Sequence, residues 1–309
     1  FTSDMRSASV KRIEDAILMR THQFREDNGP LSHPVRPESF VEINNFYTAT
    51  VYEKGAEVIG MLKRLVGDDD YSKALDLYFE RHDGDAATVE DWLKVFEDAT
   101  ARDLTAFKRW YSQAGTPRLC VKESYEDGTL TLHFSQSTKP TAGQPDKAAQ
   151  VIPIAIGLLN DNGDEVLPTT VLEMTQVEQS FAFTDLASKP VASILRDFSA
   201  PVYLDHPMSD GKRAFLMEHD TDPFNRWEAG NNLMRECLIE MSTLDSNPDH
   251  LLLDAVLAVF RDETLDPAFR ALMMRPPIQN EIAAQLSDRG QQADPQKIYE
   301  AHDRFTKAV

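Results

Sequence analysis

The sequence contains only two cysteines, Cys120 and Cys237, which lie far apart along the chain. Two isolated cysteines provide neither a disulfide framework nor a cysteine-based metal site. No apolar run approaches the ~18 residues that a membrane-spanning helix requires, and the start of the chain lacks the basic-then-apolar pattern of a signal peptide. We therefore expect a cytoplasmic protein with no membrane partner.

Positive charge is also scarce, because 32 Lys and Arg face 51 Asp and Glu, a net charge of −19. Such a surface repels phosphate backbones, so we expect no nucleic-acid partner. With 41% hydrophobic and 27% charged residues, the composition is that of an ordinary folded protein. A length of 309 residues is enough for two or three domains.

Metal-binding motifs are missing as well. No two of the eight histidines have the i, i+4 spacing and intervening Glu of a zinc-peptidase helix. The turn at residues 161–163 is no calcium loop, because the register that puts Gly163 at position 6 puts Leu158 at the first ligand position. There is no glycine-rich phosphate loop and no Gly-x-Ser-x-Gly motif. The chain begins with Phe1 instead of Met, so we expect a piece of a longer protein.

Helical periodicity dominates the chain up to about residue 115. The segment 29–39 is the exception, since its three prolines favour an extended loop. Thr88 and Asp91 form a capping box at the start of one helix, and Gly67 is placed to end another. Apolar spacing predicts helices at 8–25, 53–66, 71–82, 88–99 and 104–111.

After Pro117 the apolar period changes from about 3.6 to 2, which indicates a different architecture. Asp127-Gly128 is a hairpin signal that precedes an alternating strand at 129–134. Further strands are predicted at 151–159, 165–172, 179–184, 191–196 and 200–204. This number of short strands predicts an antiparallel β-sandwich over residues 116–207.

Helical period returns from Ser209 onward. Asp222-Pro223 has the pattern of an N-cap and a first-turn proline, and further helices are predicted at 251–260, 267–274 and 296–305. Helix pairs of this length are typical of the start of an α-solenoid. The fold class is therefore multidomain α and β, divided into a helical part at 1–115, the sandwich at 116–207 and a second helical part at 208–309.

One segment suggests chemistry: residues 44–56, NNFYTATVYEKGA. On physical grounds Tyr52 lies where a strand or turn leads into a helix, so its hydroxyl points into a cleft or its ring packs in the core. The stretch TVYEKGA at 50–56 closely resembles the catalytic-tyrosine motif of the M1 family of zinc aminopeptidases.

Other segments extend the resemblance along the chain. Residues 107–117, FKRWYSQAGTP, look like the end of the family's catalytic domain, and 79–84 and 198–202 also resemble its bacterial aminopeptidase N (alanyl aminopeptidase) branch. This resemblance implies the C-terminal helical part of a thermolysin-like domain, then a β-sandwich, then a long helical domain. Periodicity alone predicts the same order.

The resemblance also implies roles for three residues. Tyr52 would donate a hydrogen bond to the oxyanion of the scissile peptide bond, while Asn44 and Tyr47 would form walls of the pocket for the first side chain of a peptide substrate. The zinc ligands and the base lie upstream in family members, so zinc belongs to the parent protein and its ligands are absent from this chain. We expect the chain alone to be inactive for want of that upstream catalytic segment.

A second interpretation remains open, namely a non-enzymatic protein-interaction scaffold in which the sandwich and helices bind a partner and Tyr52 only packs. In either case the aromatic residues Trp92, Phe96, Phe107 and Trp110 would expose apolar surface unless another part of the protein covers them. The sequence does not indicate what that cover is.

Overall fold

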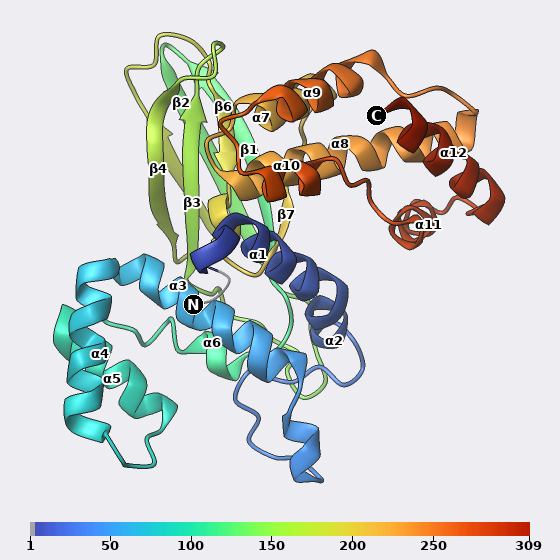
Figure 1. The fold of residues 1–309 in the computed structure, drawn as a ribbon. Coiled ribbons are helices and arrows are strands. Elements are labelled where there is room, and N and C mark those ends of the chain that lie inside the picture. The colour runs from blue at the N-terminus through green and yellow to red at the C-terminus, as the bar shows by residue number, and fades with distance from the viewer. Residues whose placement is uncertain (1–3) are drawn as a thin grey trace.

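A computed structural model of the chain describes residues 4–309. Figure 1 shows a β-sandwich flanked by two groups of helices, with α3 to α6 at one end and α7 to α12 along one side. The first helix, α1, lies beside α8 and α10 of the C-terminal group, although it is far from them in sequence.

The N-terminal helical part forms largely where periodicity predicts it. Thr88 caps one helix through reciprocal bonds, accepting from the Asp91 amide at 3.2 Å while the Asp91 carboxylate accepts from the Thr88 amide at 2.9 Å. Gly67, with φ +85°, ends another. The elements are α1 (Asp4–Leu18), a π-helical turn η1 (Met19–Gln23), α2 (Phe24–Asp27), a 3₁₀ turn η2 (Ile43–Phe46), a π-helical turn η3 (Thr50–Lys54), α3 (Gly55–Val66), α4 (Asp68–His82), α5 (Val89–Thr100) and α6 (Arg109–Ser112).

The helix predicted at 104–111 is wrong for most of its length. Residues 105–108 form turns and the helix begins only at Arg109. The chain is tightened here by i→i+3 hydrogen bonds, such as the one from the Trp110 amide to the Phe107 carbonyl. Trp110 is fully buried, and its indole nitrogen donates to the Val151 carbonyl of the sandwich at 2.7 Å. Trp110 thus lies on the short helix that does form, and the turns at 105–108 lead into it.

The sandwich consists of a four-stranded sheet in the order β5-β2-β1-β7 and a three-stranded sheet in the order β4-β3-β6. The hairpin between β1 and β2 turns at Asp127-Gly128, where both residues have positive φ. One pairing departs from the antiparallel pattern, since β7 runs parallel to β1. The strands are β1 (Arg118–Glu126), β2 (Thr129–Ser137), β3 (Ile152–Leu159), β4 (Glu165–Met174), β5 (Glu178–Phe183), β6 (Val191–Ile194) and β7 (Tyr203–Asp205).

The C-terminal part is helical throughout, and Asp222 caps α8 by accepting from the Asn225 amide at 2.8 Å. Sequence periodicity predicts α8, α9, α10 and α12, and helical period from Ser209, the residue before α7, but it gives no helix at α11. No helix within residues 4–309 combines the length and apolarity needed to cross a membrane. The helices are α7 (Asp210–His219), α8 (Pro223–Leu244), α9 (His250–Arg261), α10 (Pro267–Met273), α11 (Gln279–Asp288) and α12 (Pro295–Ala308).

Two apolar clusters form the core, and both cross the predicted domain boundaries. One joins α1 and η1 to the C-terminal helices, while the other joins residues 35–111 to the inner faces of the sandwich. Phe96, Phe107 and Trp110 are buried in the second cluster, and Trp92 packs against it. The sandwich and helices α3 to α5 therefore cover the apolar surface of these four aromatic residues, which the sequence did not indicate. Whether 1–115, 116–207 and 208–309 are separable units stays a prediction.

A buried arginine, Arg196, joins the sandwich to the C-terminal helices. Its guanidinium is inaccessible to solvent and donates to the Asp220 carboxylate at 2.8 Å and to the Thr169 hydroxyl at 2.8 Å. It also pairs with Glu165. Gly157 on β3 lies directly beneath it, so that a Cβ there would come within 2.1 Å of the guanidinium carbon. The absence of a side chain at Gly157 leaves the space that Arg196 fills.

Asp222 lies at the same junction and has a raised pKa. Burial raises its pKa from 3.8 to about 6, and the neighbouring carboxylates of Asp220 and Asp197 act in the same direction. Hydrogen bonds from the amides of Asn225 and Asp197 oppose the shift but do not cancel it. Asp222 is therefore a cap whose charge the fold disfavours near neutral pH.

Replacing this cap, Asp222→Asn, is expected to stabilise the chain at pH 7 by about 1–3 kcal/mol. Because folding raises the pKa, the stabilisation gained from proton binding is present below about pH 4 and is lost as pH rises through about 6. Asn keeps the accepting oxygen without the charge. Urea unfolding at pH 4 and pH 7 measures the difference, with the exposed cap variant Asp249→Asn as control. Equal stability of the Asp222 variant and the parent chain at pH 7 would contradict the expectation.

Candidate active site around Tyr52

Tyr52 lies on the π-helical turn η3, with its side chain directed to solvent. The residue is 55% exposed, and its ring stacks on that of Tyr47 with centroids 6.0 Å apart and planes 22° from parallel. Asn44 lies on the exposed turn η2, where its side-chain amide donates to Glu42 at 2.7 Å. The structure thus brings Tyr47 and Tyr52 into contact and places Asn44 on the segment that leads to them.

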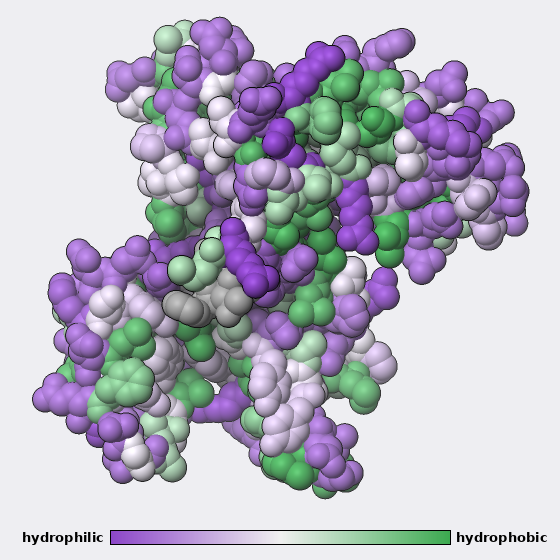
Figure 2. Space-filling model, in the orientation of Figure 1, coloured by the Kyte–Doolittle hydropathy of each residue, from purple (hydrophilic) through white to green (hydrophobic). Residues whose placement is uncertain are grey.

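The surface beside the two tyrosines is hydrophobic. Phe40, Val41 and Ile43 are each about half exposed or more, and the Phe40 ring packs edge-on against Phe46 at 5.9 Å. Figure 2 shows hydrophobic side chains at the lower tip of the molecule, where this segment lies in Figure 1. An exposed apolar area next to a free phenol suits contact with an apolar group of another molecule.

The first anchor of the tyrosine turn is Thr50. Its backbone amide and its hydroxyl both donate to one oxygen of Glu26, at 2.7 and 2.6 Å. The Gln23 amide donates to the same hydroxyl at 3.2 Å. Thr50 and Gln23 are fully buried. The start of η3 is therefore fixed to η1 and α2 by the buried Thr50 and Gln23 and by the partly exposed Glu26.

The second anchor is Lys54, four residues further along. Its ammonium group donates to Asp27 at 2.7 Å and to the Gly115 carbonyl at 3.1 Å, and lies 5.9 Å from the centre of the Trp110 ring. Lys54 and Asp27 are both fully buried. Asp27 also accepts from the Gly115 amide at 2.8 Å and from the Thr116 hydroxyl at 2.9 Å.

The ionised form of Asp27 is favoured in this environment. Burial by itself would raise its pKa, but the charge of Lys54 and hydrogen bonds from Lys54, Gly115 and Thr116 outweigh burial and lower the pKa. Every oxygen of the carboxylate has a donor, which a buried charge requires. The ion pair therefore persists at neutral pH.

We call Glu26, Asp27, Thr50, Lys54 and Thr116 the anchoring cluster. It joins the two sequence segments that carry the family resemblance, because Lys54 belongs to 50–56 while Gly115 and Thr116 belong to 107–117. Sequence reasoning missed it. The available signal was Thr50 and Lys54 at i, i+4 spacing, which places both on one side of a helical turn, with Tyr52 between them on the other side.

Zinc does not fit the described residues. Among residues 4–309, no three His, Cys, Asp or Glu side chains come together as a potential metal site. A catalytic zinc needs about three protein ligands in addition to its water. The described part of the chain therefore offers Tyr52 without a metal centre of its own.

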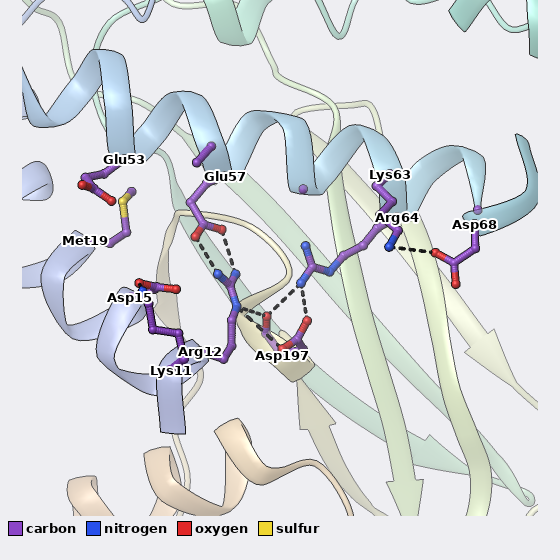
Figure 3. A pocket seen from close by; sticks show the side chains of 13 residues that line it. Lys11, Arg12, Asp15, Met19, Glu53, Glu57, Lys63, Arg64, Asp68 and Asp197 are labelled. Carbon is purple, nitrogen blue, oxygen red and sulfur yellow. Dashed lines mark hydrogen bonds and ion pairs between the residues drawn. The ribbon is translucent and has the colours of Figure 1, made fainter. Parts of the chain in front are cut away.

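A cavity of about 730 Å³ lies between α1 and α3, and Glu53 of η3 is one of the residues that line it (Figure 3). Its cations are paired in order with neighbouring carboxylates: Lys11 with Asp15, Arg12 with Glu57, Lys63 with Asp68 and Arg64 with Asp197. Asp197 lies on η4 (Arg196–Phe198) and has a positive φ. Because these four cations are each paired with a carboxylate of the described residues, the cavity holds segments of the chain together and offers no free positive charge to a ligand, although Glu53 also lines it.

Comparison with known proteins links these features to a family. The model of the peptidase family M1 domain matches residues 2–111, a domain of unknown function with an Ig-like fold matches 115–207, and a domain of unknown function with ARM repeats matches 210–309. These matches confirm the predicted fold class, namely a helical peptidase segment, a β-sandwich and a helical repeat domain.

Individual relatives give the same result. The chain is 42% identical to aminopeptidase N of Escherichia coli and 44% identical to aminopeptidase N of Caulobacter vibrioides, in both cases over all of its own length. It spans only 37% and 36% of those proteins. The crystal structure of Legionella pneumophila aminopeptidase A in complex with aspartic acid matches 96% of the chain with a TM-score of 0.75 at 24% identity, covering 34% of that chain, and this likeness concerns the fold.

Proposed function

The chain belongs to the M1 peptidase family, and we propose that it is part of a zinc aminopeptidase that hydrolyses N-terminal residues from peptides. The observation that carries the proposal is the environment of Tyr52. A mostly exposed phenol stands on a turn whose backbone is fixed from behind by buried polar groups. A structural tyrosine in a core would show the opposite arrangement, with its ring buried.

Tyr52 is the residue that we assign to catalysis. Its hydroxyl would donate to the oxygen of the scissile carbonyl as negative charge develops there in the transition state. Asn44 and Tyr47 would line the pocket for the first side chain of the peptide. Zinc would be held by residues other than those described, so this chain supplies the donor and part of the pocket.

Two further proposals follow. The 309-residue chain alone should be inactive, since an oxyanion donor without the metal and base lacks most of the chemistry of peptide hydrolysis. We also place the protein in the cytoplasm, a proposal supported by Cys120 and Cys237, both of which are free thiols.

The proposal is tested by comparing the full-length protein with the 309-residue chain. We expect the zinc-loaded full-length protein to release N-terminal residues from short peptides. The chain alone should release none, and equilibrium dialysis should find no stoichiometric zinc bound to it. A full-length protein that binds zinc but leaves peptides intact would instead favour the non-enzymatic scaffold. Tight zinc binding by the chain would contradict our assignment of the metal ligands to other residues.

A further inference from the structure

We propose that Thr50 and Lys54, held by Glu26 and Asp27, are positioning residues that fix the direction of the Tyr52 phenol. The inference rests on the proposed function, because it gives the anchoring cluster a purpose in the reaction assigned to Tyr52. None of these four side chains needs to touch substrate. They act through the backbone of η3.

The geometry of the turn supports this role. η3 is a single π-helical turn of five residues, a conformation that is rare and often found at functional sites. Its first and last residues, Thr50 and Lys54, are fully buried, whereas Tyr52 between them is 55% exposed. Both ends of the turn are therefore tied down while the middle residue projects outward. If only one end of the turn were held, the other end could move and the direction of the Tyr52 ring would not be fixed.

The chemistry of the anchors also points beyond stability. A buried ion pair is costly to desolvate and is often no more stabilising than an apolar pair of the same volume. Lys54 and Asp27 instead provide hydrogen bonds of fixed direction. The Asp27 carboxylate accepts hydrogen bonds from Lys54, Gly115 and Thr116 at 2.7–2.9 Å, and these three bonds hold it in one orientation. Thr50 is fixed in the same way through two bonds to one Glu26 oxygen. Such constraints matter for catalysis, since a displacement of about 1 Å at a reacting group can lower a rate about 10²-fold.

Thr50 offers the sharpest test, because Thr50→Val keeps the shape of the side chain and removes its hydroxyl, whereas Thr50→Ser keeps the hydroxyl. In the zinc-loaded full-length protein, Thr50→Val is expected to lower kcat at least tenfold with KM within about twofold. Thr50→Ser is expected to restore kcat to within about threefold of the parent. Both variants are also made in a Tyr52→Phe background, where Thr50→Val should cost no more than a further twofold if it acts only through the tyrosine hydroxyl.

Asp27→Asn provides the second variant, with Asp220→Asn as its matched control. Both replace a fully buried carboxylate that pairs with a buried cation, but Asp220 lies at the junction of the sandwich and the helices. In the 309-residue chain, hydrogen exchange of the η3 amides should speed up at least tenfold in Thr50→Val and Asp27→Asn and stay unchanged in Asp220→Asn. If Asp27→Asn does not fold, Thr50→Val alone decides.

The outcomes separate this inference from the proposed function. If Tyr52→Phe leaves turnover unchanged, the catalytic role proposed for Tyr52 fails and the inference fails with it, whereas the peptidase assignment fails only if the full-length protein leaves peptides intact. If Tyr52→Phe lowers kcat but Thr50→Val does not, or if Thr50→Val lowers kcat equally in both backgrounds, the positioning role is wrong and the catalytic role of Tyr52 stands. If the kcat losses of Thr50→Val and Tyr52→Phe simply add in the double variant, the anchoring cluster supports the fold only.

Discussion

Tyr52→Phe is expected to lower kcat of the full-length enzyme about 10²–10³-fold while KM stays nearly the same. The substitution removes one oxygen atom and leaves the ring, so the stacking on Tyr47 persists. What is lost is a donor to an oxygen that becomes strongly basic only in the transition state, which is why the loss should appear in kcat. Steady-state kinetics on a short peptide, with zinc content confirmed for each preparation, measure the effect.

The chain offers a matched control for this experiment. Tyr299 on α12 is 56% exposed, close to the 55% of Tyr52, but belongs to the C-terminal helices. Tyr299→Phe removes the same atom from an equally accessible tyrosine and should leave kcat within about twofold. If Tyr52→Phe keeps turnover within about threefold of the parent, Tyr52 is not an oxyanion donor, and its assigned catalytic role is wrong.

Gly157→Ala is expected to have the largest effect on stability, with a loss of about 3–5 kcal/mol or failure to fold. The added methyl group would need the space of the Arg196 guanidinium, whose nearest atoms would lie at 2.1–2.5 Å. Arg196 cannot shift without leaving Asp220, and a buried charge that loses its partner is strongly destabilising. Chemical denaturation followed by circular dichroism gives the loss in unfolding free energy.

Gly211→Ala is the control for that substitution. Gly211 lies in the first turn of α7, and a methyl group added there would meet no atom within 4 Å and no positive φ. Alanine there should be neutral or stabilise the chain by up to about 1 kcal/mol, because it reduces the freedom of the unfolded chain. A loss below about 1 kcal/mol for Gly157→Ala would show that Arg196 moves easily and that its buried network contributes little.

Local signals explain what could be predicted from the sequence. The capping box at Thr88 and the turn at Asp127-Gly128 depend on residues within a few positions of each other, and both are confirmed. The failure at 104–111 is different in kind, because Trp110 is bound to a carbonyl 41 residues away. The apolar spacing of this segment therefore reflects burial in the second core cluster, not a continuous helix.

The candidate site divides in the same way. Tyr52, Tyr47 and Asn44 come from a recognisable motif, and their assigned roles stay predictions. The anchoring cluster was not predicted, since Asp27 meets Gly115 and Thr116 across 88 and 89 residues. Buried polar groups must find partners somewhere, but the sequence does not say which partners the fold will bring.

The order of helical, β and helical parts follows from the sequence by itself, since apolar period and turn residues act over a few residues of chain. Only the tertiary structure decided that α1 packs on the C-terminal helices, that β7 runs parallel to β1, and that Lys54 is buried against Asp27. The physical reason is that these contacts depend on burial and charge pairing between distant segments. Burial and charge pairing of this kind arise only when the chain folds and its distant segments pack together in the two core clusters.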